Sequence, residues 1–197
     1  MSAYLFLILA FSCLYHGQAM SISDAEKQEI VDSHNEWRKN AGATAMRRLK
    51  WNDQLARFAQ RAASRCVFSH TSGSERQNVA GFSYIGENIY VSTAKPTFRG
   101  VADSWGSEKK SFDPATNKCS AVCGHYTQIT WAKTSDVGCA IAHCGNVQGF
   151  GHPGFLIYCN YGIGGNMIGE KPFERGAPGS KCRAVFNLPA GRDGLCG

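Results

Sequence analysis

The sequence predicts a disulfide-stapled α/β domain in which helices come first and strands follow. Three segments repeat apolar residues at intervals of three and four, as amphipathic helices do. Two later segments are rich in small, β-branched and aromatic residues, which is typical of strands. Nine cysteines in 197 residues add to this pattern and indicate an oxidising compartment.

Residues 1–19 are predicted to be a secretory signal peptide. Their apolar run, from Tyr4 to Tyr15, is too short for a permanent transmembrane helix, although no Lys or Arg precedes it. Gly17 and Ala19 are the small residues that signal peptidase prefers before a cut, here after Ala19. A signal anchor, the alternative, would need a longer apolar segment. We therefore expect a secreted, extracellular protein.

Cleavage there removes Cys13 and leaves an even set of eight cysteines, which indicates four disulfides. A zinc ribbon is the competing use of paired cysteines, but it requires a repeated C-x-x-C unit that the spacings here do not supply. The eight are Cys66, Cys119, Cys123, Cys139, Cys144, Cys159, Cys182 and Cys196.

The formal charge of +6 belongs entirely to the part after the signal peptide, because residues 1–19 contain no Asp, Glu, Lys or Arg. A basic surface favours acidic partners or anionic lipid. The basic residues are scattered without an aromatic-interleaved stripe, so we expect no nucleic-acid binding. Residues 20–175 are expected to form one domain, and residues 176–197 a short tail packed on it.

The first helix is predicted to begin at Ser23, which can form a capping box with Glu26. The second begins after Asn52 and is expected to end near His70. The apolar stripe of the first helix comprises Ile30, His34, Trp37 and Ala41, and that of the second comprises Leu55, Ala59, Ala62 and Cys66.

A third helix is predicted after Pro96, with Phe98, Val101, Trp105 and Glu108 on one face. The carboxylate of Glu108 would then lie on the same helix face as these three apolar side chains. A carboxylate in that position costs free energy unless it is paired, which favours a functional role.

Three strands are predicted: a short one over Asn88–Val91, then Val137–His143 and Phe155–Tyr161, which a Gly-rich loop joins as a hairpin. Cys159 alternates onto one face of the last strand, so it can bond to Cys139 across the pair if the register allows.

Two segments, Gly124–Trp131 (GHYTQITW) and Leu156–Tyr161 (LIYCNY), resemble the signature segments of the CAP superfamily of secreted proteins. Gly86–Tyr90 and the Trp-x-x-Glu spacing of Trp105 and Glu108 are also similar to elements of that family. The resemblance covers essentially the whole chain after the signal peptide. A short secreted domain with a compact tail, as here, is most similar to venom-allergen-like proteins of parasitic worms. It implies a three-layer α/β/α sandwich with a short, disulfide-closed C-terminal tail.

The resemblance also implies a polar cleft in which His70, Glu87, Glu108 and His125 meet. Imidazole and carboxylate groups suit Zn²⁺ or another divalent cation, which would not be essential for the fold. Taken singly, each has an ordinary alternative as a hydrogen-bonding or salt-bridged residue. The disulfide pairs that the family implies are Cys66 with Cys144, Cys119 with Cys123, Cys139 with Cys159, and Cys182 with Cys196.

Members of the family are associated with sterol or fatty-acid binding, so the resemblance implies a non-enzymatic lipid-binding protein acting at a host protein, membrane surface or other extracellular interface. Its expected lipid contact is an aromatic-bearing mobile loop over residues 82–98, containing Phe82, Tyr84, Tyr90 and Phe98. For Tyr90 the alternative, a core position, is favoured.

A metal-dependent hydrolase is the second hypothesis, with Glu87 or Glu108 as general base beside a metal-bound water. No H-E-x-x-H or G-x-S-x-G motif supports it.

Gly106, where relatives often carry an aromatic residue, is expected to open the cleft wall.

Overall fold

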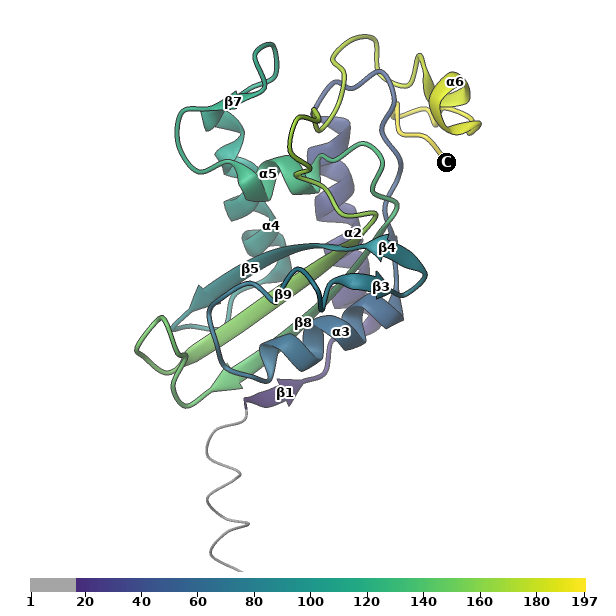
Figure 1. Ribbon diagram of the computed structural model, residues 1–197. Helices are drawn as coiled ribbons and strands as arrows, with labels where there is room; N and C mark the ends of the chain where they lie inside the picture. The colour runs from purple at the N-terminus through teal and green to yellow at the C-terminus, as the bar shows by residue number, and fades with distance from the viewer. Residues whose placement is uncertain (1–16) are drawn as a thin grey trace, which may run out of the picture.

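The computed structural model describes residues 17–197, which fold as three layers (Figure 1). The helices are α2 (Asp24–Lys39), α3 (Asp53–Ala63), α4 (Phe98–Gly106), α5 (Gly124–Ile129) and α6 (Cys182–Phe186), with a 3-10 turn, η1, at Ser107–Ser111. The strands are β1 (Gln18–Met20), β2 (Lys50–Trp51), β3 (Gln77–Val79), β4 (Phe82–Tyr84), β5 (Gly86–Ser92), β6 (Phe112–Asp113), β7 (Lys118–Cys119), β8 (Asp136–Cys144) and β9 (Gly154–Gly162).

The central sheet has the order β1-β8-β9-β5, with β2 pairing β8 at one end. The pairs β1–β8, β8–β9 and β9–β5 are antiparallel, whereas β2 is parallel to β8. Helix α3 packs on one face of this sheet, and α2, α4 and α5 cover the other. The predicted α/β/α sandwich is therefore confirmed.

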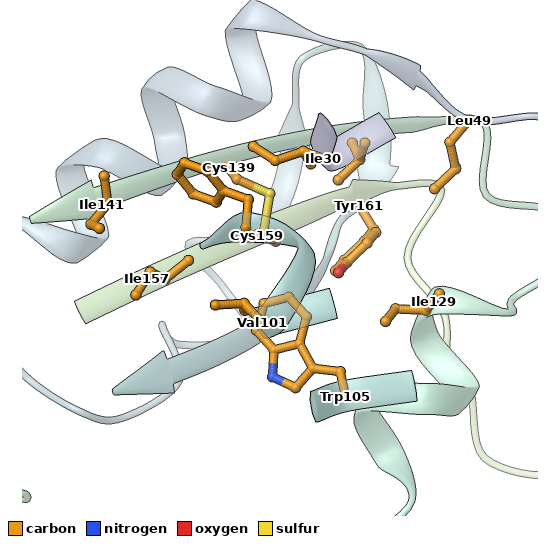
Figure 2. Close-up of a cluster of buried hydrophobic side chains, with 12 residues drawn as sticks. Ile30, Leu49, Val101, Trp105, Ile129, Cys139, Ile141, Ile157, Cys159 and Tyr161 are labelled. Carbon is orange, nitrogen blue, oxygen red and sulfur yellow. A yellow bond between two sulfur atoms is a disulfide. The ribbon is translucent and has the colours of Figure 1, made fainter. Parts of the chain in front are cut away.

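The alternation along β9 places its side chains in two core clusters, one on each face of the sheet. Ile157, Cys159 and Tyr161 face α2, α4 and α5 (Figure 2), whereas Leu156 and Tyr158 face α3. The register places Cys139 directly opposite Cys159. The predicted hairpin is confirmed, and β5 forms the other edge of the sheet.

Local signals fix where two helices begin. Ser23 and Glu26 form the predicted capping box of α2, and Asn52 caps α3 by accepting from two backbone amides. The expectation that the second helix ends near His70 is wrong, because α3 ends at Ala63. Cys66 has a φ of 55°, a left-handed conformation that α-helix excludes, and it bonds to Cys144.

Gly106 does not open the cleft wall. A Cβ atom at this position would overlap the ring of Trp37 on α2, so the absent side chain lets α2 and α4 approach closely. Trp37 is anchored there because its Nε1 donates to Asp103 Oδ1 at 2.9 Å. The α-helix ends at Gly106, and Glu108 lies in η1.

All four predicted disulfides are present: Cys66–Cys144, Cys119–Cys123, Cys139–Cys159 and Cys182–Cys196. The last closes the C-terminal tail, as expected. The tail is tied to the domain where Cys196 N donates to Met46 O at 2.7 Å and Arg48 N donates to Cys196 O at 2.9 Å.

Most of the predicted signal peptide lies outside the described residues. Its last two residues, Gln18 and Ala19, pair with β8, so a cut after Ala19 would remove two of the three residues of β1. Cleavage at that bond therefore stays a prediction. Within residues 17–197, no helix is both long and apolar enough to cross a membrane.

Candidate functional site

The carboxylate of Glu87 is buried at β5 and holds His70 in a fixed orientation. Its Oε1 accepts from His70 Nδ1 and from Thr71 N, both at 2.9 Å. Its Oε2 accepts from Thr71 Oγ1 at 2.8 Å and from Asn160 Nδ2 at 3.3 Å. Burial alone would raise the pKa of Glu87, but the hydrogen bonds from His70, Thr71 and Asn160 lower it below its ordinary value. Glu87 is therefore ionised at neutral pH.

An ionised carboxylate only accepts hydrogen bonds, so the proton of a neutral His70 resides on Nδ1. This tautomer leaves the lone pair of Nε2 available. The His70 side chain as a whole is 55% exposed.

His125 and Glu108 form a second pair of the same kind. His125 Nδ1 lies 2.6 Å from Glu108 Oε1, and the backbone amides of His125 and Tyr126 donate to Oε2 at 3.0 and 3.3 Å. Trp105 stacks on the imidazole with ring centroids 5.8 Å apart. Glu108 lies in η1, beyond the end of the helix whose face it was predicted to share, and these three hydrogen bonds satisfy its charge.

The two pairs flank the edge strand β5. Glu87 is in register with Asn160 and shares its face, on the side of α3. The next residue, Asn88, points to the opposite face, where its Nδ2 donates to His125 O at 3.1 Å. In the part of the chain that the structure describes, no three His, Cys, Asp or Glu side chains are grouped to hold a metal ion. The four predicted ligands thus form two pairs rather than one cluster.

The donor chemistry nevertheless fits a divalent cation. A metal-binding histidine usually donates its other ring N–H to a carboxylate, which fixes the tautomer and raises the basicity of the ligand nitrogen. Both His70 and His125 have this arrangement. Glu87 and Glu108 thus orient the two imidazoles as carboxylates do in metal sites, and metal binding by His70 and His125 stays a prediction.

A buried polar network that sequence reasoning missed supports the second pair. His34 Nδ1 bonds to Ile30 O at 2.7 Å, and His34 Nε2 bonds to the hydroxyl of Tyr161 at 2.9 Å. Asn88 Nδ2 donates to that hydroxyl at 3.2 Å as well as to His125 O. Burial lowers the pKa of His34 to about 4 and raises that of Tyr161 well above its ordinary value. An Asn within an apolar strand is the sequence signal that could have indicated this network.

All four predicted lipid-contacting aromatics lie in helices or strands, so the expectation of a mobile loop is wrong. Phe82 and Tyr84 are in β4, Tyr90 is in β5, and Phe98 is the first residue of α4. Only Ile85 and residues 93–97 of this stretch lie outside helices and strands.

Packing also limits what these rings can contact. Phe98 is only 5% exposed, and Tyr90 packs against the same core cluster, as its alternative interpretation predicted. Phe82 and Tyr84 are half-buried, and the guanidinium of Arg76 lies 5.1 Å from the Tyr84 ring. A lipid contact therefore stays a prediction for Phe82 and Tyr84, whereas Phe98 belongs to the core.

A pocket of about 460 Å³ lies where the C-terminal tail meets the domain, and we call it the tail pocket. Two salt bridges lie at its rim. Lys133 pairs with Glu170 at 2.8 Å, and Lys181 pairs with Glu174 at 2.9 Å. Its apolar lining includes Trp131, Pro172, Phe173, Val185 and Phe186. Because these walls come from separate parts of the chain, no local sequence pattern indicated the pocket.

Known proteins share both the sequence pattern and the fold. The pattern of the cysteine-rich secretory protein family matches residues 31–161. GLIPR1-like protein 1 of Mus musculus is 38% identical over 157 residues, which cover 78% of this chain and 66% of the mouse protein. Allurin of Xenopus tropicalis is 37% identical over 190 residues, which cover 89% of this chain and 90% of allurin.

Solved structures agree with this assignment. Venom allergen-like protein 4 of Schistosoma mansoni has a TM-score of 0.65 and 27% identity, with 79% of this chain and 97% of that chain covered. NaASP2, solved with Zn²⁺, has a TM-score of 0.67 and 24% identity, with 89% and 97% covered, and its likeness shows the fold alone. The family pattern spans more than half of the sequence, and the fold and the disulfides agree with it, so the chain belongs to the cysteine-rich secretory protein (CAP) family.

Proposed function

We propose that this protein is a secreted, non-enzymatic CAP-domain protein that binds a fatty acid or a sterol and acts at an extracellular or host interface. The tail pocket is the observation that carries the proposal. Its volume of about 460 Å³ lies within the range of about 300–1,000 Å³ that is usual for small-molecule sites. The likeness to a worm venom allergen-like protein supports the same class of function by analogy.

The chemistry of the tail pocket suits an amphiphile. Aromatic and aliphatic side chains can cover an acyl chain, which gains about 25 cal/mol for each Å² of apolar surface removed from water. The two rim salt bridges are exposed, and pairs of this kind contribute about 0–1 kcal/mol each. A ligand carboxylate can therefore replace Glu170 or Glu174 beside a lysine at little cost.

Equilibrium binding of radiolabelled palmitate and cholesterol to the delipidated, disulfide-intact protein tests the proposal. Val185→Glu places a charge on a pocket-lining residue that is 54% exposed, so the fold should survive. We expect palmitate affinity to fall by at least about tenfold, the equivalent of about 1.4 kcal/mol. Val122→Glu, the same substitution on an exposed valine outside the pocket, should bind like the wild type.

The possible outcomes distinguish an error in the proposed function from an error in the position of the binding site. No saturable binding of either lipid would contradict the proposed function itself. Binding that survives Val185→Glu but is lost in Phe82→Ala combined with Tyr84→Ala would move the site to β4.

A metal-dependent activity is the second candidate, favoured by the carboxylate-oriented imidazoles. His70 and His125 would hold a divalent ion through Nε2, and such an ion would lower the pKa of a bound water for hydrolysis. Calorimetric titration with Zn²⁺ should show binding that His70→Ala combined with His125→Ala removes, while palmitate binding stays unchanged. Zn²⁺-dependent cleavage of a lipid ester or a peptide, lost in that double variant, would replace the non-enzymatic proposal.

A further inference from the structure

Large apolar side chains are exposed on two neighbouring loops beside α5. Val122 is 70% exposed, Met167 is 45% exposed and Ile168 is fully exposed. We call these three residues the apolar tip. They make up half of the large apolar side chains exposed on the described surface, so they are a local concentration rather than scattered singles.

The loop that carries Met167 and Ile168 is held firmly next to α5. Asn166 Oδ1 accepts from Thr127 Oγ1 at 2.7 Å, and its Nδ2 donates to Gly124 O at 2.8 Å. These bonds link Asn166 to the segment that begins two residues after Val122. The apolar tip is therefore presented by a defined backbone.

Two further bonds join the same loop to the β6–β7 turn. Asn117 Nδ2 donates to Glu170 O at 3.1 Å, and Lys171 Nζ donates to Ala115 O at 3.2 Å. β7, α5 and α6 lie at the end of the molecule opposite to the β8–β9 turn (Figure 1). Both loops thus lie at this end of the fold.

Lysines near the apolar tip give it positive charge. Lys118 precedes Cys119, which bonds to Cys123 next to Val122, and Lys171 lies three residues after Ile168. Lys110, Lys118 and Lys171 are exposed, and no carboxylate within residues 17–197 forms a salt bridge with them. Of the nearby acidic residues, Glu170 is paired with Lys133, and Asp113 lies opposite Lys118 in the β6–β7 ladder. The whole chain carries a formal charge of +6.

We propose that the apolar tip docks this protein on anionic phospholipid membranes. The side chains of Val122, Met167 and Ile168 enter the interfacial region, while the nearby lysines contact the phospholipid headgroups. Apolar insertion supplies affinity, and the lysines supply the preference for anionic lipid. The inference goes beyond lipid binding in the tail pocket, and its three apolar residues are not part of the pocket lining. Glu170 and Lys171 border both sites, so docking would bring the pocket rim close to the bilayer.

Co-sedimentation with vesicles of phosphatidylcholine, with and without phosphatidylserine, tests the proposal on the full disulfide-bonded chain. We expect binding to the anionic vesicles that weakens as salt is added. Met167→Ser combined with Ile168→Ser should reduce this binding at least about tenfold, because each change removes apolar surface that would leave water. Lys118→Glu combined with Lys171→Glu should reduce binding to the anionic vesicles only.

Phe68→Ser is the matched control, because Phe68 is also exposed and apolar but lies outside both the tip and the tail pocket. It should sediment like the wild type. Equal binding of the wild type and the Met167→Ser, Ile168→Ser variant would overturn the proposal. The proposal would also be overturned if the wild type did not bind vesicles but self-associated through the tip in analytical ultracentrifugation. The tip would then be a protein interface.

Binding of palmitate in solution, without vesicles, distinguishes a failure of membrane docking from a failure of the proposed function. The tip variant should retain palmitate affinity while losing vesicle binding, and Val185→Glu should do the reverse. Loss of palmitate binding in every protein, with vesicle binding intact, would contradict the proposed function and leave docking in place.

Discussion

His34 is fully buried, and both of its ring nitrogens are already engaged, so protonating it should oppose folding. The carbonyl of Ile30 can only accept, which places the imidazole proton on Nδ1. Nε2 must then accept from the hydroxyl of Tyr161. A second proton on Nε2 would remove that acceptor and bury a positive charge in the core.

The size of the effect follows from the two pKa values of this residue. Burial lowers the pKa of His34 to about 4 in the folded protein, against 6.5 for an ordinary histidine. Between these values the unfolded chain binds the proton and the folded protein does not, so stability falls as the pH falls. At about pH 5 the loss relative to about pH 7.5 is about 2 kcal/mol, and it reaches about 3 kcal/mol below pH 4.

Denaturant unfolding of the disulfide-intact protein at about pH 7.5 and about pH 5 measures this loss. Gln can accept from Tyr161 through Oε1 without titrating, so the His34→Gln variant should lose about 2 kcal/mol less than the wild type between the two pH values. His152→Gln, a change on the surface, should follow the wild type. Equal losses for the wild type and His34→Gln would refute the reasoning that His34 is neutral in the fold.

Three further changes test the packing around the site. Arg38 is buried and donates to five backbone carbonyls, so Arg38→Met should cost about 3–5 kcal/mol by leaving buried acceptors without donors, measured as a shift in denaturant midpoint. Gly106→Ala should cost about 1–3 kcal/mol by overlap with Trp37, and a double-mutant cycle with Trp37→Ala should show that this cost is relieved. Replacing Cys66 and Cys144 by Ser should cost about 4 kcal/mol in thermal or denaturant unfolding, because that bridge closes the longest loop.

The elements that the sequence predicted well are those with their own local signals. The capping box at Ser23, the cap at Asn52 and the alternation along β9 each act within a few residues. The short elements were not predicted, because tertiary contacts decide them. β2 has only two residues, Lys50 and Trp51, and it exists because it pairs with β8 more than eighty residues later.

For the site, motif positions identified the residue types but not their arrangement. Which atoms His70 and Glu87 present depends on Thr71 and Asn160, and on the face of β5 that carries Glu87. No spacing rule encodes that the two imidazole–carboxylate pairs flank the edge strand β5. The predicted lipid aromatics failed for a related reason, since an aromatic residue such as Phe98 looks the same in sequence whether it fills a core or meets a ligand.

The arrangement of the carboxylates bears on whether the site can catalyse hydrolysis. A general base must reach a water molecule with a free lone pair and a pKa near the working pH. Glu87 is buried, accepts four hydrogen bonds and has a lowered pKa, so it is a poor proton acceptor at neutral pH. Glu108 accepts from the ring and the amide of His125 and from the amide of Tyr126, and its side chain is 17% exposed. Both carboxylates are thus committed to orienting an imidazole, which favours binding over catalysis at this site.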